Sequence, residues 1–360
     1  MLEKGKISAF QMAIMMYPVI LATAILSLPS TIAKYAMNDL WVSPLWASLS
    51  GFLTVYIVYH LHTLYPKQNI IQCSEQIIGR IPGKILGLFY LFYLLIATGD
   101  IMRGYGEFIV GALLPKTPLF IVIITMILVS GFAVRGGVEV IGRTAQIFVP
   151  IFIISLILLL LFLLPELELS YIFPLFENGI KPSIMGASSP QAWFGEFFLI
   201  SFLLPFLSDI KKGRKWSMIS VFAVMITMVI TNLVILFLFG RTITNYIYPL
   251  MSAARYISIA DFFEHIESVV TAMWVAGQFI KTAVFYYATV LTTAQILDLS
   301  SYGPIVFPIG IFIVLISLWG WSSFSDYSDW SANISPFYAL FMQTILSLLL
   351  LVIGIVRKKT

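Results

Sequence analysis

Long apolar segments dominate this sequence and limit what it can fold into. A helix that crosses a bilayer needs roughly 20 predominantly apolar residues. Ten segments come close to this requirement, and they are Phe10–Ala33, Val42–Leu64, Lys84–Leu113, Pro118–Val134, Gln146–Leu164, Ala187–Ser208, Trp216–Phe239, Thr271–Leu297, Gly303–Trp321 and Ser335–Val356. Their apolar residues run on continuously, whereas those of barrel strands alternate. The sequence therefore predicts an all-α polytopic membrane protein with ten transmembrane helices.

The content and placement of charged residues support this class and give it an orientation. Only 11% of the residues are charged, whereas a typical soluble domain has roughly 25%. This excludes a soluble enzyme, a disordered chain and a coiled coil. If the N-terminus lies inside, 14 of the 21 Lys and Arg residues fall on the inner side, and only five fall on the outer side. The positive-inside rule then places both termini in the cytoplasm. The net charge of +4 is thus a signal of topology, and we expect no nucleic-acid partner.

The connectors between the spans are short, so we predict one integral membrane domain over residues 1–360. On the inner side, the isoleucines within residues 65–83 share one helix face. This pattern is typical of a short helix on the membrane surface or of a packed connector. On the outer side, we expect a short helix over Ile257–Val270, where Phe262 and Phe263 stand among acidic residues.

Two of the ten segments combine proline with small residues. The first reads Ala-Thr-Ala-Ile-Leu-Ser-Leu-Pro over residues 22–29, and the sixth reads Ala-Ser-Ser-Pro-Gln-Ala-Trp-Phe-Gly-Glu over residues 187–196. Interrupted helices at matching positions of two halves are typical of inverted-repeat transporters, whose ligand binds at the breaks. We therefore predict that the first and sixth helices are interrupted. The alternative is that Pro29 and Pro190 form ordinary kinks of membrane helices.

Three ionisable residues share one stripe of the third segment. They are Asp100, Arg103 and Glu107. Charge within a span is costly and usually functional. Arg103 can pair with Asp100 on one side and with Glu107 on the other. The trio is therefore either a self-contained structural network or part of a binding site.

Two further ionisable residues, Glu196 and Lys281, have no partner on their own helices. Each stands near the middle of its span, as Ala24 does in the first segment, so all three are expected at a similar depth. One hypothesis is that Lys281 takes the place of a bound cation between spans one and eight and holds the first helix in place. The alternative is a plain ion pair of Lys281 with Glu196 or with Asp100.

The sequence contains no arrangement typical of an enzyme. The histidines, His60, His62 and His265, stand in two unrelated places. No zinc-protease, nucleophile-elbow or phosphate-loop motif is present, and a single cysteine excludes a cysteine-based metal site. We expect no catalytic residue, no cofactor and no metal site.

Several stretches, taken in order, resemble one known family. They are Ala22–Pro29, Gly83–Tyr90, Arg103–Phe108, Leu114–Pro118, Gly137–Arg143 and Phe194–Glu196. Together with the length and the ten spans, they make the chain similar to the permease-like B subunit of endospore germinant receptors. That family belongs to the amino acid–polyamine–organocation (APC) transporter superfamily.

This resemblance implies a 5+5 inverted-repeat fold, with one repeat over about residues 10–164 and the other over about residues 187–356. It implies a nutrient sensor that binds a small-molecule germinant, namely an amino acid, a sugar or an ion, between spans one, three, six and eight. It also implies residence in the spore inner membrane and assembly with an A subunit and a C subunit. The alternative is a stand-alone proton-coupled amino-acid transporter, because fold does not determine function.

These arguments give two groups of candidate site residues. The predicted ligand-binding residues are Ala22, Thr23, Ala24, Ile25, Gly99, Asp100, Trp193, Phe194, Gly195, Glu196, Thr282 and Phe285. The predicted charge network consists of Asp100, Arg103, Glu107, Glu196 and Lys281. The chain departs from its transporter relatives at both breaks. Residues 22–24 read Ala-Thr-Ala where those relatives usually have Gly-x-Gly, and Gly195 directly precedes Glu196 where they have one residue between. The methyl groups at the first break narrow the space for a ligand carboxylate.

Overall fold

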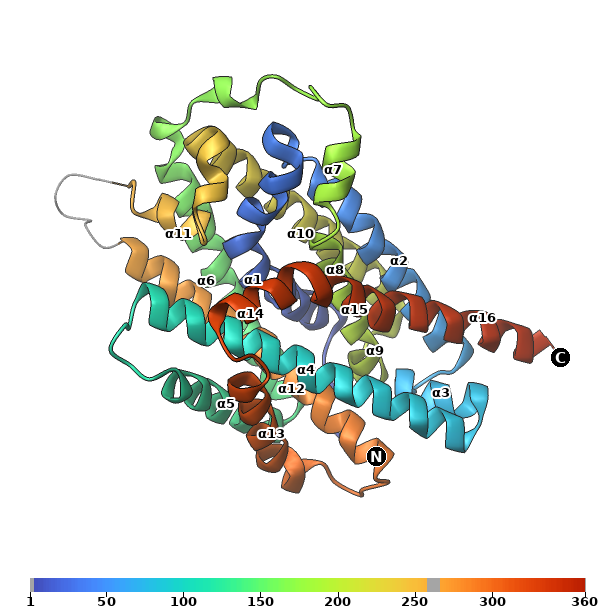
Figure 1. Ribbon diagram of the computed structural model, residues 1–360. Helices are drawn as coiled ribbons and strands as arrows, with labels where there is room; N and C mark the ends of the chain where they lie inside the picture. The colour runs from blue at the N-terminus through green and yellow to red at the C-terminus, as the bar shows by residue number, and fades with distance from the viewer. Residues whose placement is uncertain (1–2, 258–265, 360) are drawn as a thin grey trace.

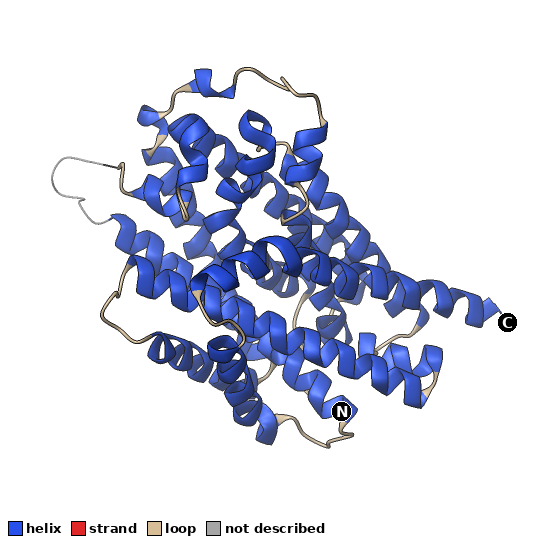
Figure 2. Ribbon diagram, viewed as in Figure 1, coloured by secondary structure: helices blue, strands red, loops and turns tan. Residues whose placement is uncertain are grey.

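The computed structural model describes residues 3–257 and 266–359. Figure 2 shows that they form helices joined by loops, and within these ranges the one β-bridge pairs Ile7 with Leu207. The α-helices are α1 (Ala9–Ala36), α2 (Ser43–Leu64), α3 (Ile70–Ile78), α4 (Arg80–Ala112), α5 (Leu119–Gly136), α6 (Val138–Phe162), α7 (Lys181–Gly186), α8 (Pro190–Gly195), α9 (Ile200–Leu203), α10 (Ile210–Phe239), α11 (Pro249–Ala254), α12 (Ile266–Ile296), α13 (Val306–Trp319), α14 (Phe324–Asp329), α15 (Ser335–Leu340) and α16 (Leu346–Lys359). The short outer helix expected over Ile257–Val270 falls mostly on residues 258–265, which lie outside the described residues.

All ten predicted spans are helical, although not all of them are single helices. Among the described residues, seven helices are long and apolar enough to cross a membrane, and Gly303–Trp319 is a shorter apolar helix. The eighth predicted span lies in α12, which is 31 residues long, and the sixth is divided into short pieces. The all-helical class is confirmed, whereas the count of ten spans stays a prediction.

Helix α1 lies in the middle of the bundle (Figure 1). It begins at Ala9 because Ser8 and Gln11 form a capping box, in which each side chain accepts a hydrogen bond from the backbone N–H of the other. Its main neighbours are α6, α10 and α12. Nearly all of its side chains between Met12 and Leu28 are buried, which explains why the helix is apolar on every face.

The predicted interruption of the first span is not present in the structure. Helix α1 continues from Ala9 to Ala36 with Pro18 and Pro29 inside it. Pro29 removes the hydrogen bond to the carbonyl four residues earlier, but alanine, the best helix former, stands at positions 22 and 24. The indole Nε1–H of Trp274 in α12 also donates to the Ala22 carbonyl. The backbone of residues 22–25 is therefore part of a continuous helix.

The sixth predicted span is interrupted. After α8 come a 3₁₀ segment η4 (Glu196–Leu199), the single turn α9, and a second 3₁₀ segment η5 (Leu204–Phe206). Pro190 occupies the first turn of α8, where the fixed φ and missing N–H of proline are tolerated. Gly195 ends α8 beside the side chain of Gln343, since a Cβ there would lie 2.1 Å from Gln343 Oε1. The span thus changes its helix type at Glu196, in its interior.

The end of the bundle that the sequence predicts to face the cytoplasm is closed by the N-terminal segment. The Ile7 N–H donates to the Phe206 carbonyl at 3.0 Å, and the Ser208 N–H donates to the Ile7 carbonyl at 2.9 Å. The buried carboxylate of Glu3 accepts a hydrogen bond of 2.8 Å from the Tyr302 hydroxyl. These contacts join the start of the chain to η5 and to the loop before α13.

The isoleucine-rich connector on the inner side is packed against the bundle. Helix α3 begins after Asn69, which caps it, and it contacts α4 and α16. Ile70, Ile71 and Ile77 are buried, whereas Ile81 is exposed. Of the two interpretations of this connector, the structure supports the packed one.

Candidate functional site

A buried ion pair joins three spans in the interior of the bundle. Lys281 of α12 is fully buried, and its Nζ lies 2.9 Å from both carboxylate oxygens of Glu196 in η4. The same Nζ lies 2.9 Å from Oγ1 of Thr23 in α1. A lysine ammonium has three N–H donors, so these contacts use all of them. The cluster therefore holds α1, the interrupted sixth span and α12 together at one depth.

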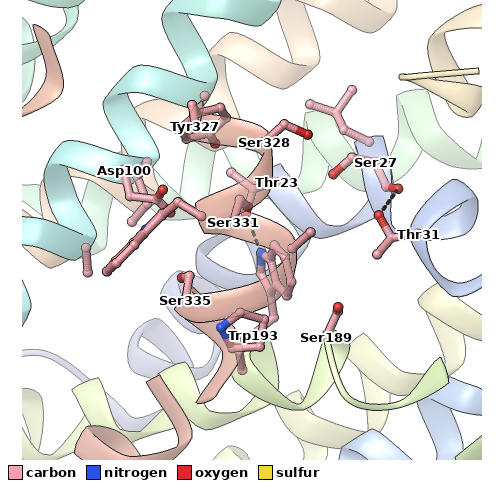
Figure 3. Close-up of a pocket in the computed structure, with 18 of the residues that line it drawn as sticks. Thr23, Ser27, Thr31, Asp100, Ser189, Trp193, Tyr327, Ser328, Ser331 and Ser335 are labelled. Carbon is pink, nitrogen blue, oxygen red and sulfur yellow. Dashed lines mark hydrogen bonds between the residues drawn. The ribbon is translucent and has the colours of Figure 1, made fainter. Parts of the chain in front are cut away.

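Two tryptophans attach α1 to the neighbouring spans near this cluster. Trp193 of α8 donates from Nε1 to Thr23 Oγ1 at 2.8 Å, which Figure 3 shows as a dashed line. Trp274 of α12 donates to the Ala22 carbonyl, one residue earlier. The middle of α1 thus has polar contacts with both the sixth span and α12, although its own helix is continuous.

A cavity of about 200 Å³ lies next to the ion pair, which forms part of its wall. Figure 3 labels ten of the residues that line it, which come from α1 (Thr23, Ser27, Thr31), α4 (Asp100), the sixth span (Ser189, Trp193) and the segment from α14 to α15 (Tyr327, Ser328, Ser331, Ser335). Glu196 and Lys281 also belong to its wall. Three further lining residues, Lys34, Tyr248 and Phe324, stand near helix ends predicted to face outside. The cavity therefore approaches the outer end of the bundle, opposite the end closed by the N-terminal segment.

Asp100 differs from the other carboxylate in the cavity because it has no hydrogen-bond partner at Oδ1 among the described residues. The predicted contact with Arg103 does not form. Arg103 instead donates from Nε to Glu107 Oε1 at 2.8 Å, and from Nη1 to the Trp321 carbonyl at 3.2 Å. The guanidinium is directed toward the C-terminal end of α13, whose backbone carbonyls lack helical partners. The trio on α4 is thus a pair, Arg103 and Glu107, and a separate carboxylate.

The structure brings some of the predicted site residues to the cavity and keeps others away from it. Those that line it are Thr23, Asp100, Trp193, Glu196 and Lys281. Those outside its lining are Ala22, Ala24, Ile25, Gly99, Phe194, Gly195, Thr282 and Phe285.

Packing explains the residues that lie outside the lining. Gly99 faces α13, since a Cβ there would lie 2.6 Å from Ile316 Cγ2. Phe194 packs over Gly51 of α2, and Thr282 donates to the Met102 sulfur at 3.4 Å.

Sequence reasoning missed the wall that is formed near the C-terminus. Tyr327, Ser328, Ser331 and Ser335 come from α14, the π-helical segment η8 (Trp330–Ile334) and α15. Serines at positions 328, 331 and 335 share one helix face because they are three and four residues apart. That spacing was the available signal, although serine on one helix face does not by itself indicate a cavity.

Comparison with known protein families shows to which family this chain belongs. Residues 6–324 match the model of a family described as spore germination protein. The chain belongs to the spore germination protein family. Among curated relatives of this family, the spore germination protein KB of Bacillus subtilis (strain 168) is 24% identical over 99% of this chain and 97% of its own length. The spore germination protein YndE of the same organism is 25% identical over 81% of each chain.

Solved structures confirm the fold. The structure of MhsT in complex with L-phenylalanine superposes with a TM-score of 0.68 and 13% identity, over 98% of this chain and 89% of that one. A nucleobase-cation-symport-1 family transporter, in a closed conformation with bromovinylhydantoin bound, superposes with a TM-score of 0.66 and 12% identity, over 96% of this chain and 78% of that one. The chain thus has the fold of these two solved structures, and its family and its long apolar helices make it an integral membrane protein. Its matches are spore germination proteins and transporters, not enzymes.

Proposed function

We propose that this chain is the nutrient-sensing, permease-like subunit of a spore germination receptor, and that a small-molecule germinant binds in the cavity above Lys281. The observation that carries the proposal is the contact of Lys281 with both Glu196 and Thr23 at 2.9 Å. This cluster forms part of the cavity wall and connects three spans. A ligand bound there touches all three spans at once, and it favours the arrangement of helices to which it binds more tightly.

The proposed class of ligand is based on a solved structure with the same fold, and the proposed partners are based on the family. A fold neighbour was solved with L-phenylalanine, and the cavity of about 200 Å³ suits a molecule of that size range. An amino acid is therefore the first class to test, with sugars and ions after it. Membership of a spore germination family is consistent with the proposed assembly with an A subunit and a C subunit and with residence in the spore inner membrane. The excess of Lys and Arg on one side supports the proposed orientation with both termini in the cytoplasm.

A thermal-shift panel of amino acids, sugars and salts on the purified chain tests the location of the site. We expect at least one compound to raise the melting temperature. This shift should be lost or strongly reduced in the variants Thr23→Val and Glu196→Gln, because both residues line the cavity beside Lys281. Thr125→Val is the matched control, because Thr125 is exposed on α5 and its hydroxyl donates within its own helix. A shift that survives both cavity substitutions places the ligand elsewhere.

Transport by the chain alone is the alternative function, and the transporter fold is the observation that favours it. Uptake of the compound into vesicles that contain only this chain separates the two functions. A sensing subunit binds without accumulating the compound, and its deletion abolishes the germination response. Accumulation that depends on a proton gradient identifies a transporter.

A further inference from the structure

The cavity wall contains a carboxylate, Asp100, that forms no ion pair with another residue in the described part of the chain. Oδ1 of Asp100 is buried, and no described residue donates a hydrogen bond to it. A buried charged group without a partner is costly, and such residues within a membrane usually mark the path or site of a ligand. Because the Asp100 side chain forms part of the cavity wall, a molecule in the cavity can contact this carboxylate.

The cations near Asp100 are already engaged with other groups. Lys281 directs its three N–H donors to Glu196 and Thr23. Arg103, one turn further along α4, donates to Glu107 and to backbone carbonyls. The remaining basic residue of the wall, Lys34, is exposed. In the interior of the cavity Lys281 is thus paired with Glu196, and Asp100 is the carboxylate to which the described residues donate no charged hydrogen bond at Oδ1.

The rest of the wall suits a positively charged group joined to an apolar body. The Phe108 ring lies 5.0 Å from that of Tyr248 and 5.4 Å from that of Trp274, and all three residues line the cavity. Aromatic faces attract ammonium groups through their quadrupoles, and they also bury the hydrocarbon part of a ligand. Tyr327 of α14 packs against the face of α4 that carries Asp100. A Cβ at Gly104, one turn after Asp100, would lie 2.2 Å from the Tyr327 hydroxyl.

Away from Lys34, which stands at the outer rim, the described wall offers an anion no free backbone N–H groups on α1. A broken helix presents free N–H groups to a carboxylate, but α1 is continuous through residues 22–25. The indole N–H groups of Trp193 and Trp274 already donate to Thr23 and to the Ala22 carbonyl.

We infer that the cavity recognises the ammonium group of a small organic amine, with Asp100 as its counter-ion, and that a carboxylate on the ligand is dispensable. This inference rests on the proposed function, because it requires a small molecule to enter the cavity. It adds the chemical class of the ligand and the residue that selects it. In the complex, the ammonium donates to the Asp100 carboxylate, and the apolar part of the ligand packs between the aromatic rings.

Matched ligands separate the two ends of an amino acid. The probes are L-alanine, L-valine and L-phenylalanine, each with its amide, which keeps the ammonium, and its N-acetyl derivative, which keeps the carboxylate. D-glucose, sodium chloride and potassium chloride complete the set. Binding is measured by thermal shift and by calorimetry on the full chain in lipid nanodiscs. We expect the preferred amino acid and its amide to bind within about threefold of each other, and the N-acetyl derivative to bind at least about tenfold more weakly.

Substitutions of Asp100 assign the effect to this residue. Asp100→Asn should weaken binding of the amine probes at least about tenfold, and Asp100→Glu should keep most of it. Asp100→Asn replaces a buried carboxylate that has no hydrogen-bond donor at Oδ1 in the described structure, so the unliganded protein should melt at the same temperature or higher, which shows that it is folded. Glu107→Gln is the matched control, because this carboxylate stands on the same helix but is paired with Arg103 and lies outside the cavity wall.

Each outcome decides the inference. Binding that survives in Asp100→Asn, or binding of N-acetyl derivatives as tight as that of the amides, overturns it. Stabilisation by glucose or salt alone overturns it and leaves the proposed function in place. A chain that responds to none of the probes contradicts both.

Discussion

The first and the sixth spans carry similar local sequences and adopt different structures. Each combines proline with alanine and serine, and each contributes to the same cavity. Helix α1 nevertheless continues for 28 residues, whereas the sixth span is divided among α8, η4, α9 and η5. The ion pair of Lys281 with Glu196, with its contact to Thr23, joins the continuous span to the divided one.

The position of each proline explains the difference. Pro29 lies inside α1, where it removes one backbone hydrogen bond from a long helix whose neighbours surround it. Pro190 occupies the first turn of α8, and Pro205 lies in the first turn of η5. At these positions proline begins a segment. Two such starts within one span force it into short pieces, and the 3₁₀ turn between them orients Glu196 toward Lys281.

The substitution with the largest expected effect removes the cation that joins the two spans. In Lys281→Met, the Glu196 carboxylate remains buried without its partner, and breaking a buried pair in this way typically costs about 3–5 kcal/mol. We expect a large decrease in the melting temperature of the chain in nanodiscs. The double variant Lys281→Met with Glu196→Gln should recover most of the loss, since it leaves no charge unpaired. A Lys281→Met protein with unchanged stability and ligand binding would show that the pair does not hold the spans together.

The second test concerns the break itself. In Gly195→Ala, the new Cβ would meet Gln343 Oε1 at 2.1 Å, and the Gln343 side chain is held by its 2.5 Å hydrogen bond to the Tyr93 hydroxyl. Overpacking of this kind costs about 1–3 kcal/mol, so the melting temperature should fall. The matched control is Gly111→Ala near the end of α4, where a Cβ meets nothing within 4 Å, and its melting temperature should stay the same or rise slightly. Equal effects of the two substitutions would contradict the close approach at Gly195.

The sequence predicted much of this arrangement, and the failures have physical causes. Apolar length predicted the helices, and equal depth within their spans predicted that Glu196 and Lys281 could meet. The continuous α1 receives a hydrogen bond at Ala22 from Trp274, a residue 252 positions away, and no local pattern contains such a contact. The wall formed by Ser328, Ser331 and Ser335 depends on how the chain returns to the bundle after α13, which residue spacing alone does not determine.

The smallest test addresses that distant contact on the continuous span. Trp274→Phe keeps an aromatic ring beside Phe108 but removes the N–H that donates to the Ala22 carbonyl. The loss of one buried hydrogen bond costs about 1 kcal/mol, so the melting temperature should change only slightly. The local effect should be larger, because the Ile25 carbonyl already lacks its helical partner at Pro29, so the helix loses a tertiary restraint next to a place where its own hydrogen bonding is weakened. Hydrogen exchange at residues 22–26 should therefore accelerate in this variant, whereas Trp319→Phe, at a side chain that is 79% exposed, should leave it unchanged. Unchanged exchange in Trp274→Phe would show that alanine at positions 22 and 24 is sufficient to keep α1 continuous without help from α12.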